Sequence, residues 1–170
     1  LCGAGRQRKH LKRDDNREAF HSHLVRTDSW LKLLTPERES ILPPTRGILF
    51  LNPSSGSKLL AGQKDALKEA AAEAGLEVIP LAGGMDVTQT IRERLGRGMK
   101  LFVAAGGDGT IHHVIQPLVN SEAVLGVIPA GTYNHFARDL NIPLDWREAL
   151  DVVLTGQIRQ VDAARVNDRF

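Results

Sequence analysis

The sequence is 170 residues long and 42% hydrophobic, which is enough apolar material to bury one core of ordinary size. Its formal net charge of +2 is close to balance, and we expect no nucleic-acid partner. No apolar run approaches the roughly 20 residues that span a membrane, and the single cysteine, Cys2, excludes an internal disulfide framework, so we expect a cytoplasmic protein.

Residues 1–45 are mostly polar and form a candidate N-terminal extension. Five Lys and Arg residues precede the first acid, Asp14, and indicate either a solvated tail or a segment that touches anionic lipid or nucleic acid. Apolar residues near one helical face predict a helix over residues 18–34. Pro43 and Pro44 disfavour helix continuation and suit a linker. We therefore expect an extension, partly disordered or helical, that ends at residue 45.

From residue 46 the chain alternates short apolar runs with longer amphipathic ones. The apolar runs predict strands at residues 47–52, 76–81, 99–105 and 123–129. The amphipathic runs predict helices at residues 59–75, 87–98, 111–119, 133–140 and 145–156, with Asp86 as the cap of the second. This rhythm is typical of an α/β fold with a parallel sheet covered on both faces, here over residues 46–156.

The last residues, 157–170, begin with an extended stretch that suits the first strand of a further β domain. The sequence opens with Leu1 rather than Met and closes soon after this stretch. We therefore expect a fragment of a longer protein.

Three turn-forming stretches follow the predicted strands. They read NPSSGSK (52–58), GGDGT (106–110) and PAGTYN (129–134). In an open parallel sheet, ligands collect beyond the carboxyl ends of the strands, where glycine-rich turns let main-chain N–H groups approach an anion. Such turns also serve simply to connect strands to helices, but three on one sheet edge favour a phosphate site. The sequence lacks a Walker loop and a G-x-G-x-x-G motif, so it supports neither a P-loop NTPase nor a Rossmann dehydrogenase.

Asp108, inside the GGDGT stretch, has two interpretations. A carboxylate in a phosphate-binding loop repels its ligand unless a cation such as Mg²⁺ lies between them, or unless it accepts a proton from an incoming hydroxyl. The alternative is that Asp108 caps the helix that begins at about Thr110. Both interpretations stay open at this point.

The order and spacing of NPSSG, GGDGT and IPAGTYNHFARDLNIP resemble the diacylglycerol kinase catalytic domain family, over about residues 46–170. That family includes bacterial lipid kinases and sphingosine kinases, and GGDGT is shared with NAD kinases. GTYNHFAR is the more discriminating element, because NAD kinases lack it. VDAARVN (161–167) looks like the family's crossing into its second domain.

The resemblance implies a three-layer nucleotide-binding domain followed by a β-sandwich domain, with Mg²⁺ and ATP in the cleft and a lipid hydroxyl at a membrane surface as acceptor. It implies that the chain is the ATP-binding half of a lipid kinase. Because the family's general base lies in the second domain, we expect this half to be inactive alone. A homodimer stays open. The implied nucleotide contacts are Asn52, Gly56, Gly106, Gly107, Asp108, Gly109, Thr110, Thr132 and Asn134, with Asp108 meeting the metal and Lys58 placed to reach a phosphate.

Several positions depart from the family pattern. His112 and His113 stand where members usually carry Asn-Glu, and we expect packing or surface roles for both. His135 stands where many members carry Asp, and an ion pair with Asp139 or a contact with the nucleotide is expected there. Leu81 lies near the family's threonine after the second strand. Two alternatives therefore remain: a soluble phosphotransferase similar to NAD kinase, and a nucleotide-binding module without catalysis.

Overall fold

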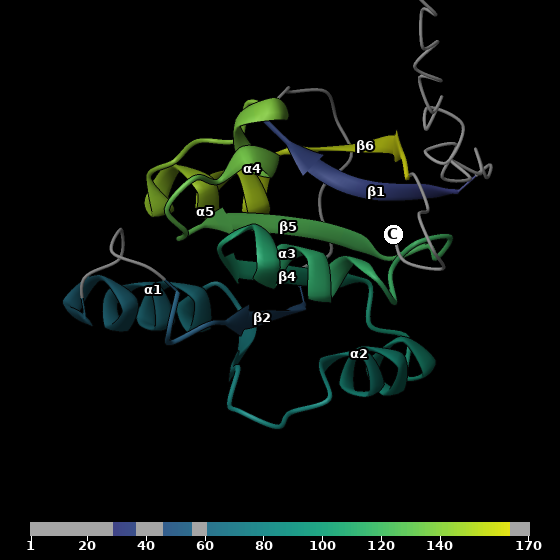
Figure 1. Cartoon of the computed structure of the whole chain (residues 1–170), viewed down its shortest axis with the longest axis horizontal. Helices are drawn as coiled ribbons and strands as arrows, with labels where there is room; N and C mark the ends of the chain where they lie inside the picture. The colour runs from purple at the N-terminus through teal and green to yellow at the C-terminus, as the bar shows by residue number, and fades with distance from the viewer. Residues whose placement is uncertain (1–28, 37–45, 56–60, 164–170) are drawn as a thin grey trace, which may run out of the picture.

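The computed structural model describes residues 29–36, 46–55 and 61–163 (Figure 1). Within these ranges strands and helices alternate along the chain. The elements are β1 (Trp30–Thr35), β2 (Gly47–Leu51), α1 (Ala61–Glu73), β3 (Leu76–Pro80), α2 (Val87–Gly96), β4 (Leu101–Gly106), α3 (Asp108–Ile115), β5 (Val124–Pro129), α4 (His135–Asp139), α5 (Trp146–Thr155) and β6 (Gln157–Asp162).

The strands form one six-stranded sheet in the order β3-β2-β4-β5-β1-β6. Neighbouring strands from β3 to β1 are parallel, and β6 runs antiparallel to β1. In Figure 1, β6, β1, β5 and β2 follow one another from the top of the view downwards. Helix α1 packs against α5, and α2 packs against α3. Because parallel crossovers are right-handed, these two pairs cover opposite faces of the sheet. The predicted three-layer α/β fold is confirmed.

The core lies around the three central strands. Every residue of β2, β4 and β5 is buried, as expected for parallel strands covered on both faces. Strands β3 and β6 lie at the edges and keep exposed positions. The apolar runs that predicted these strands are therefore the residues that both helical layers cover.

The predicted helices begin and end close to the observed ones. Local contacts and backbone angles explain where some of them start or stop. The Asp86 carboxylate accepts the Gln89 N–H at 2.9 Å, which confirms it as the cap of α2. Gly75, where the first helix was expected to stop, has a φ of 83° just after α1. Helix α3 begins at Asp108, earlier than predicted, and ends at Ile115 before Pro117. No described helix is both long and apolar enough to cross a bilayer.

The helix predicted over residues 18–34 is wrong from Trp30 onward. Residues 30–35 form β1, which lies between β5 and β6. The spacing of Leu31 and Leu34 suits one helical face, but backbone pairing with two neighbouring strands decides the conformation. The earlier part of this predicted helix lies outside the described residues.

Strand β6 was predicted to begin a further β domain, and it pairs with β1 along its whole length. The strands on either side of the predicted boundaries at residues 45 and 156 thus belong to the same sheet. The boundaries themselves stay predictions.

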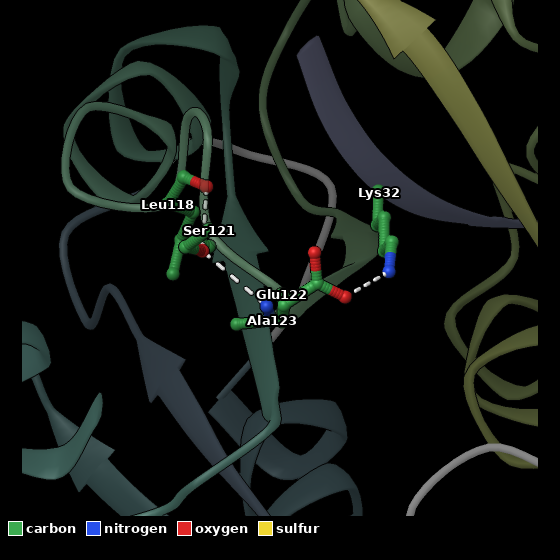
Figure 2. Close-up of polar contacts among 5 residues, drawn as sticks. All are labelled: Lys32, Leu118, Ser121, Glu122 and Ala123. Carbon is green, nitrogen blue, oxygen red and sulfur yellow. Dashed lines mark hydrogen bonds and ion pairs between the residues drawn. The ribbon is translucent and has the colours of Figure 1, made fainter. Parts of the chain in front are cut away.

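Strand β1 is also tied to the turn that precedes β5. Lys32 Nζ lies 2.5 Å from Glu122 Oε2. The Ser121 hydroxyl donates to Leu118 O and accepts the Ala123 N–H, and Figure 2 shows these contacts. The hydrogen bond and charge of Lys32, with a smaller effect from Lys100, lower the pKa of the Glu122 carboxyl. This turn therefore positions Glu122 beside β1.

Candidate functional site

The three predicted loops lie at one edge of the sheet, beyond the carboxyl ends of β2, β4 and β5. The chain leaves β2 toward β3 on one side and leaves β4 toward β5 on the other. This reversal between adjacent strands is where ligands bind in open α/β sheets. The first loop follows β2, the second, GGDGT, follows β4, and the third, PAGTYN, follows β5.

Asn52 joins the first loop to the second. Its Nδ2 donates to Thr110 Oγ1 at 2.9 Å, and its backbone N–H donates to Ala105 O at 3.0 Å. Its side-chain oxygen accepts the Ser54 N–H at 2.9 Å, which shapes the turn after β2. Asn52 thus fixes the position of Thr110 as well as the path of its own loop.

The second loop carries the start of α3 with little side-chain bulk. A Cβ on Gly106 would lie 2.4 Å from Thr110 Oγ1, so only glycine lets Thr110 fold back onto the strand end. Gly107 O accepts the N–H groups of Thr110 and Ile111 at 2.9 and 3.1 Å. The preceding N–H groups, of Asp108 and Gly109, have no acceptor within the helix. The loop can therefore present main-chain N–H groups to an anion.

The third loop meets the second through close backbone contacts. A Cβ on Gly131 would lie 2.5 Å from Gly107 Cα, so the two loops meet at their glycines. Ala130 N–H also donates to Gly106 O at 2.8 Å. Asn134, with a left-handed φ of 53°, is fully buried and exchanges two hydrogen bonds with Gly131. These contacts make the third loop a closed turn pressed against the second.

Asp108 connects the same two loops through its side chain. Its Oδ2 accepts the His135 N–H at 3.3 Å and its Oδ1 accepts the Phe136 N–H at 3.1 Å. Both donors belong to the first turn of α4, so Asp108 caps α4. The expected alternative of capping near Thr110 is wrong, because α3 begins at Asp108 itself and has no side-chain cap.

A pocket of about 470 Å³ opens where these loops meet. Its apolar lining residues come from the segment that follows β3 and from the first residue of α2. The rest of the lining carries amide, hydroxyl and backbone groups of the three loops, with one histidine of α3. The apolar lining residues are Leu81, Met85 and Val87, and the others are Asn52, Ser55, Gly107, Gly109, Thr110, His113 and Gly131.

The predicted site residues divide into those that line this pocket and those that support it. Asn52, Gly107, Gly109 and Thr110 belong to the lining. The other predicted contacts in the second and third loops, Gly106, Asp108, Thr132 and Asn134, lie outside it. Gly56 and Lys58 lie outside the described residues. The assignment of nucleotide contacts stays a prediction.

The three histidines have different surroundings. His112 is exposed and lies near Gln116, as its predicted surface role requires. His113 is exposed and also lines the pocket, so its expected packing or surface role stays a prediction. In the described structure His135 stacks on Tyr133, with ring centroids 5.6 Å apart, and forms no ion pair with Asp139.

The lining residues that the sequence did not predict as nucleotide contacts are Ser55, Leu81, Met85, Val87, His113 and Gly131. Ser55 and Gly131 belong to stretches that were already singled out. Met85 and Val87 follow β3, whose carboxyl end lies beside that of β2. Since parallel strands end at the same edge, the segment after every strand of the sheet is a candidate.

The described residues include no group of three or more His, Cys, Asp or Glu side chains placed to hold a metal ion. Asp108, between two glycines that line the pocket, offers a single carboxylate. Mg²⁺ that binds with a phosphate substrate takes one or two carboxylates, together with phosphate oxygens and water. The residues fit a metal that arrives with its phosphate ligand.

A family model described as the diacylglycerol kinase catalytic domain matches residues 46–166. The chain belongs to this family. The diacylglycerol kinase of Bacillus subtilis (strain 168) is 37% identical over 132 residues, which cover 74% of this chain and 43% of the relative. The diacylglycerol kinase of Staphylococcus saprophyticus is 33% identical over 129 residues, which cover 74% of this chain and 42% of the relative.

The fold agrees with that of a solved structure of a diacylglycerol kinase. A crystal structure of a diacylglycerol kinase from Bacillus anthracis str. Sterne aligns with a TM-score of 0.50 at 27% identity, and covers 62% of this chain and 38% of that chain. The predicted resemblance is confirmed. The chain spans about two fifths of the length of these relatives.

Proposed function

We propose that the chain is the nucleotide-binding part of a lipid kinase that transfers the γ-phosphoryl group of ATP to a lipid hydroxyl. The observation that carries the proposal is that the three loops after β2, β4 and β5 meet at one pocket in a member of this family. Leu81, Met85 and Val87 offer an apolar side that suits a planar base. The loop residues of the lining offer N–H and hydroxyl donors that suit phosphates.

Phosphoryl transfer depends mostly on positioning and on stabilising negative charge. The hydroxyl oxygen bonds to the γ-phosphorus as the bond to the β,γ-bridging oxygen breaks, and ADP leaves. The main-chain N–H groups at the start of α3 would orient the phosphates and stabilise their charge. Mg²⁺, held by Asp108 and the phosphates, would supply further charge neutralisation.

The proton of the lipid hydroxyl requires an acceptor. The described lining of the pocket contains no Asp or Glu side chain that could accept it. The relatives are more than twice as long as the matched part. We therefore propose that the remaining part of a longer protein supplies the base and the lipid site. Residues 1–170 alone would bind ATP weakly and transfer phosphate slowly, in the cytoplasm or at a membrane surface.

Calorimetric titration of the chain with ATP and Mg²⁺ tests the nucleotide site, and we expect saturable binding. A chimera tests the reaction: residues 46–166 replace the corresponding part of the Bacillus subtilis relative. Radiolabelled ATP is then offered with diacylglycerol in mixed micelles, with NAD, or with no acceptor. Label in the lipid supports the proposal. Label in NAD, or no ATP binding by either protein, contradicts it.

A further inference from the structure

Asp108 places a negative charge between two pocket-lining glycines, in a loop suited to anions. Repulsion of a phosphate by a nearby carboxylate weakens binding. Both oxygens of this carboxylate, however, accept main-chain N–H groups of α4, at 3.3 and 3.1 Å. The carboxylate thus has a structural use that does not need a metal.

Helix α4 depends on this contact because it lacks a cap of its own. Asn134 occupies the N-cap position, but it is in the left-handed conformation and makes no side-chain cap bond. Its amide is bonded instead to Gly131. The two N–H groups that open α4 are therefore satisfied from the second loop, 27 and 28 residues earlier in the sequence.

The contact also acts beside a second link between the loops. Gly107, the neighbour of Asp108, meets Gly131 at backbone distance. Gly131 lines the pocket, and its position is set on one side by Gly107 and on the other by the turn that leads into α4. A change in the start of α4 would therefore move a wall of the pocket.

We propose that Asp108 is a positioning residue, which holds α4 and the third loop in place so that two loops face the same phosphate chain. The proposal rests on the proposed function, since it names how one residue of that site supports nucleotide binding. It assigns Asp108 a role that persists without Mg²⁺. Asp108 acts on the nucleotide through Gly131.

The affinity for ADP, measured in EDTA, tests the proposal, because loss of charge repulsion and loss of positioning change this affinity in opposite directions. Removal of a negative charge near a phosphate would by itself strengthen ADP binding. If Asp108 positions the third loop, D108N and D108A should instead weaken ADP binding by about fivefold or more, since the lost bonds include a charged acceptor. Unchanged or tighter binding by the variants would overturn the proposal.

The matched control is D145N, since Asp145 also caps a helix with its carboxylate, by accepting the N–H groups of Arg147 and Glu148. Asparagine is a good cap within its own helix, so D145N should bind ADP like the wild type. In D108N, by contrast, the side-chain NH₂ group would oppose one of the two main-chain N–H groups of α4. A loss of the same size in D145N would point to general destabilisation and contradict the proposal.

Amide hydrogen exchange gives a second readout, which needs no nucleotide and begins with the wild type alone. The amides of His135 and Phe136 should exchange slowly in the wild type and faster in D108N. Rapid exchange in the wild type would overturn the proposal even if the variants fail to fold. Absence of ATP binding by the wild type, with slow exchange of these amides, would instead contradict the proposed function.

Discussion

His112 and His113 are adjacent on α3, yet only His113 lines the pocket. Both side chains are exposed, and their rings lie edge to face with centroids 6.1 Å apart. Successive helical residues point about 100° apart, so one faces the loops and the other faces away. The pair therefore allows the pocket to be probed against a neighbour in almost the same environment.

A carboxylate at residue 113 should weaken nucleotide binding. H113E would place a negative charge in the lining of a pocket that receives phosphates, and we expect ATP affinity to fall about tenfold, or about 1.4 kcal/mol. H112E adds the same charge outside the lining and should leave the affinity within about twofold. Calorimetry of both variants measures the difference, and equal losses would place the phosphates elsewhere.

The role of Asp108 shows how far local sequence reasoning reaches. GGDGT predicted a functional loop after β4, and the loop lies there. The cap partner of Asp108 could not be predicted, because the usual rule looks for N–H donors within the next helical turn. Its donors lie in another helix, and only the meeting of the two loops brings them within reach.

The contact between the second and third loops depends on glycine at both positions. G131A would put a Cβ 2.5 Å from the Cα of Gly107, which is backbone and cannot rotate away. We expect a loss of about 1–3 kcal/mol in the free energy of unfolding, as for other overpacked sites, and a weaker affinity for ATP. Chemical denaturation followed by circular dichroism measures the first effect.

G96A is the matched control for this substitution. Gly96 lies in α2, and a Cβ there meets nothing within 4 Å. Alanine is favoured over glycine in helices, so G96A should leave stability unchanged or raise it by up to about 1 kcal/mol. A loss in G96A as large as in G131A would mean that the loop contact is not the cause.

The ion pair between Lys32 of β1 and Glu122 should make the stability of the fold depend on pH. Because Lys32 lowers the pKa of Glu122 in the folded state, the contribution of the ion pair to stability is present above the ordinary carboxyl pKa. It is lost as the pH falls through the lowered value. An NMR titration of Glu122 should give a midpoint below that of a free glutamate, and K32M should raise it.

Glu122 is exposed, so the effect of the pair on stability should be small and screened by salt. We expect the unfolding temperatures of E122Q and the wild type to differ little, with less difference in 0.5 M than in 0.05 M NaCl. An unchanged midpoint in K32M would mean that another group lowers this pKa.

Helices and central strands were predictable because their signals are local. The cap at Asp86 and the apolar runs of β2, β4 and β5 can each be recognised from a few neighbouring residues of the sequence. Strand β1 was missed because WLKLLT is also compatible with a helix, and its partners lie far along the chain. Whether such a segment forms a strand depends on the neighbours that it packs against more than on its own residues.

The site as a whole follows from the topology of the sheet. After β2 the chain adds its next strand on one side, and after β4 on the other, which leaves a crevice at the carboxyl ends of these two strands. The alternation of strands and helices in the sequence was therefore enough to predict the general location of the site. The apolar part of the lining could not be predicted, because it depends on the path of the chain after β3, which brings Met85 and Val87 to the same pocket as Asn52.

The place of β1 in the sheet gives a test of the domain boundary predicted at residue 45. Leu33 is fully buried in the common core. L33A should lower the free energy of unfolding of the whole chain by about 2–5 kcal/mol, in one cooperative transition. K32A, one residue earlier and partly exposed, should cost much less.

Thermal and urea unfolding, followed by two probes, measure both variants. If residues 1–45 formed a separate extension, L33A would leave the main transition unchanged. A single transition shifted by L33A places β1 within the same folding unit as the pocket.

The pairing of β1 with β6 has a kinetic consequence. Thr35 and Gln157 are partners although 122 residues separate them, and β1 also needs β5. Contacts between distant residues carry a large cost in chain entropy before they form, and they slow folding. During synthesis β1 emerges before the other described strands. Both of its edges can be paired only after nearly all of the described chain, up to β6, has been made. Its apolar residues are therefore among the last to be sheltered from other nascent chains.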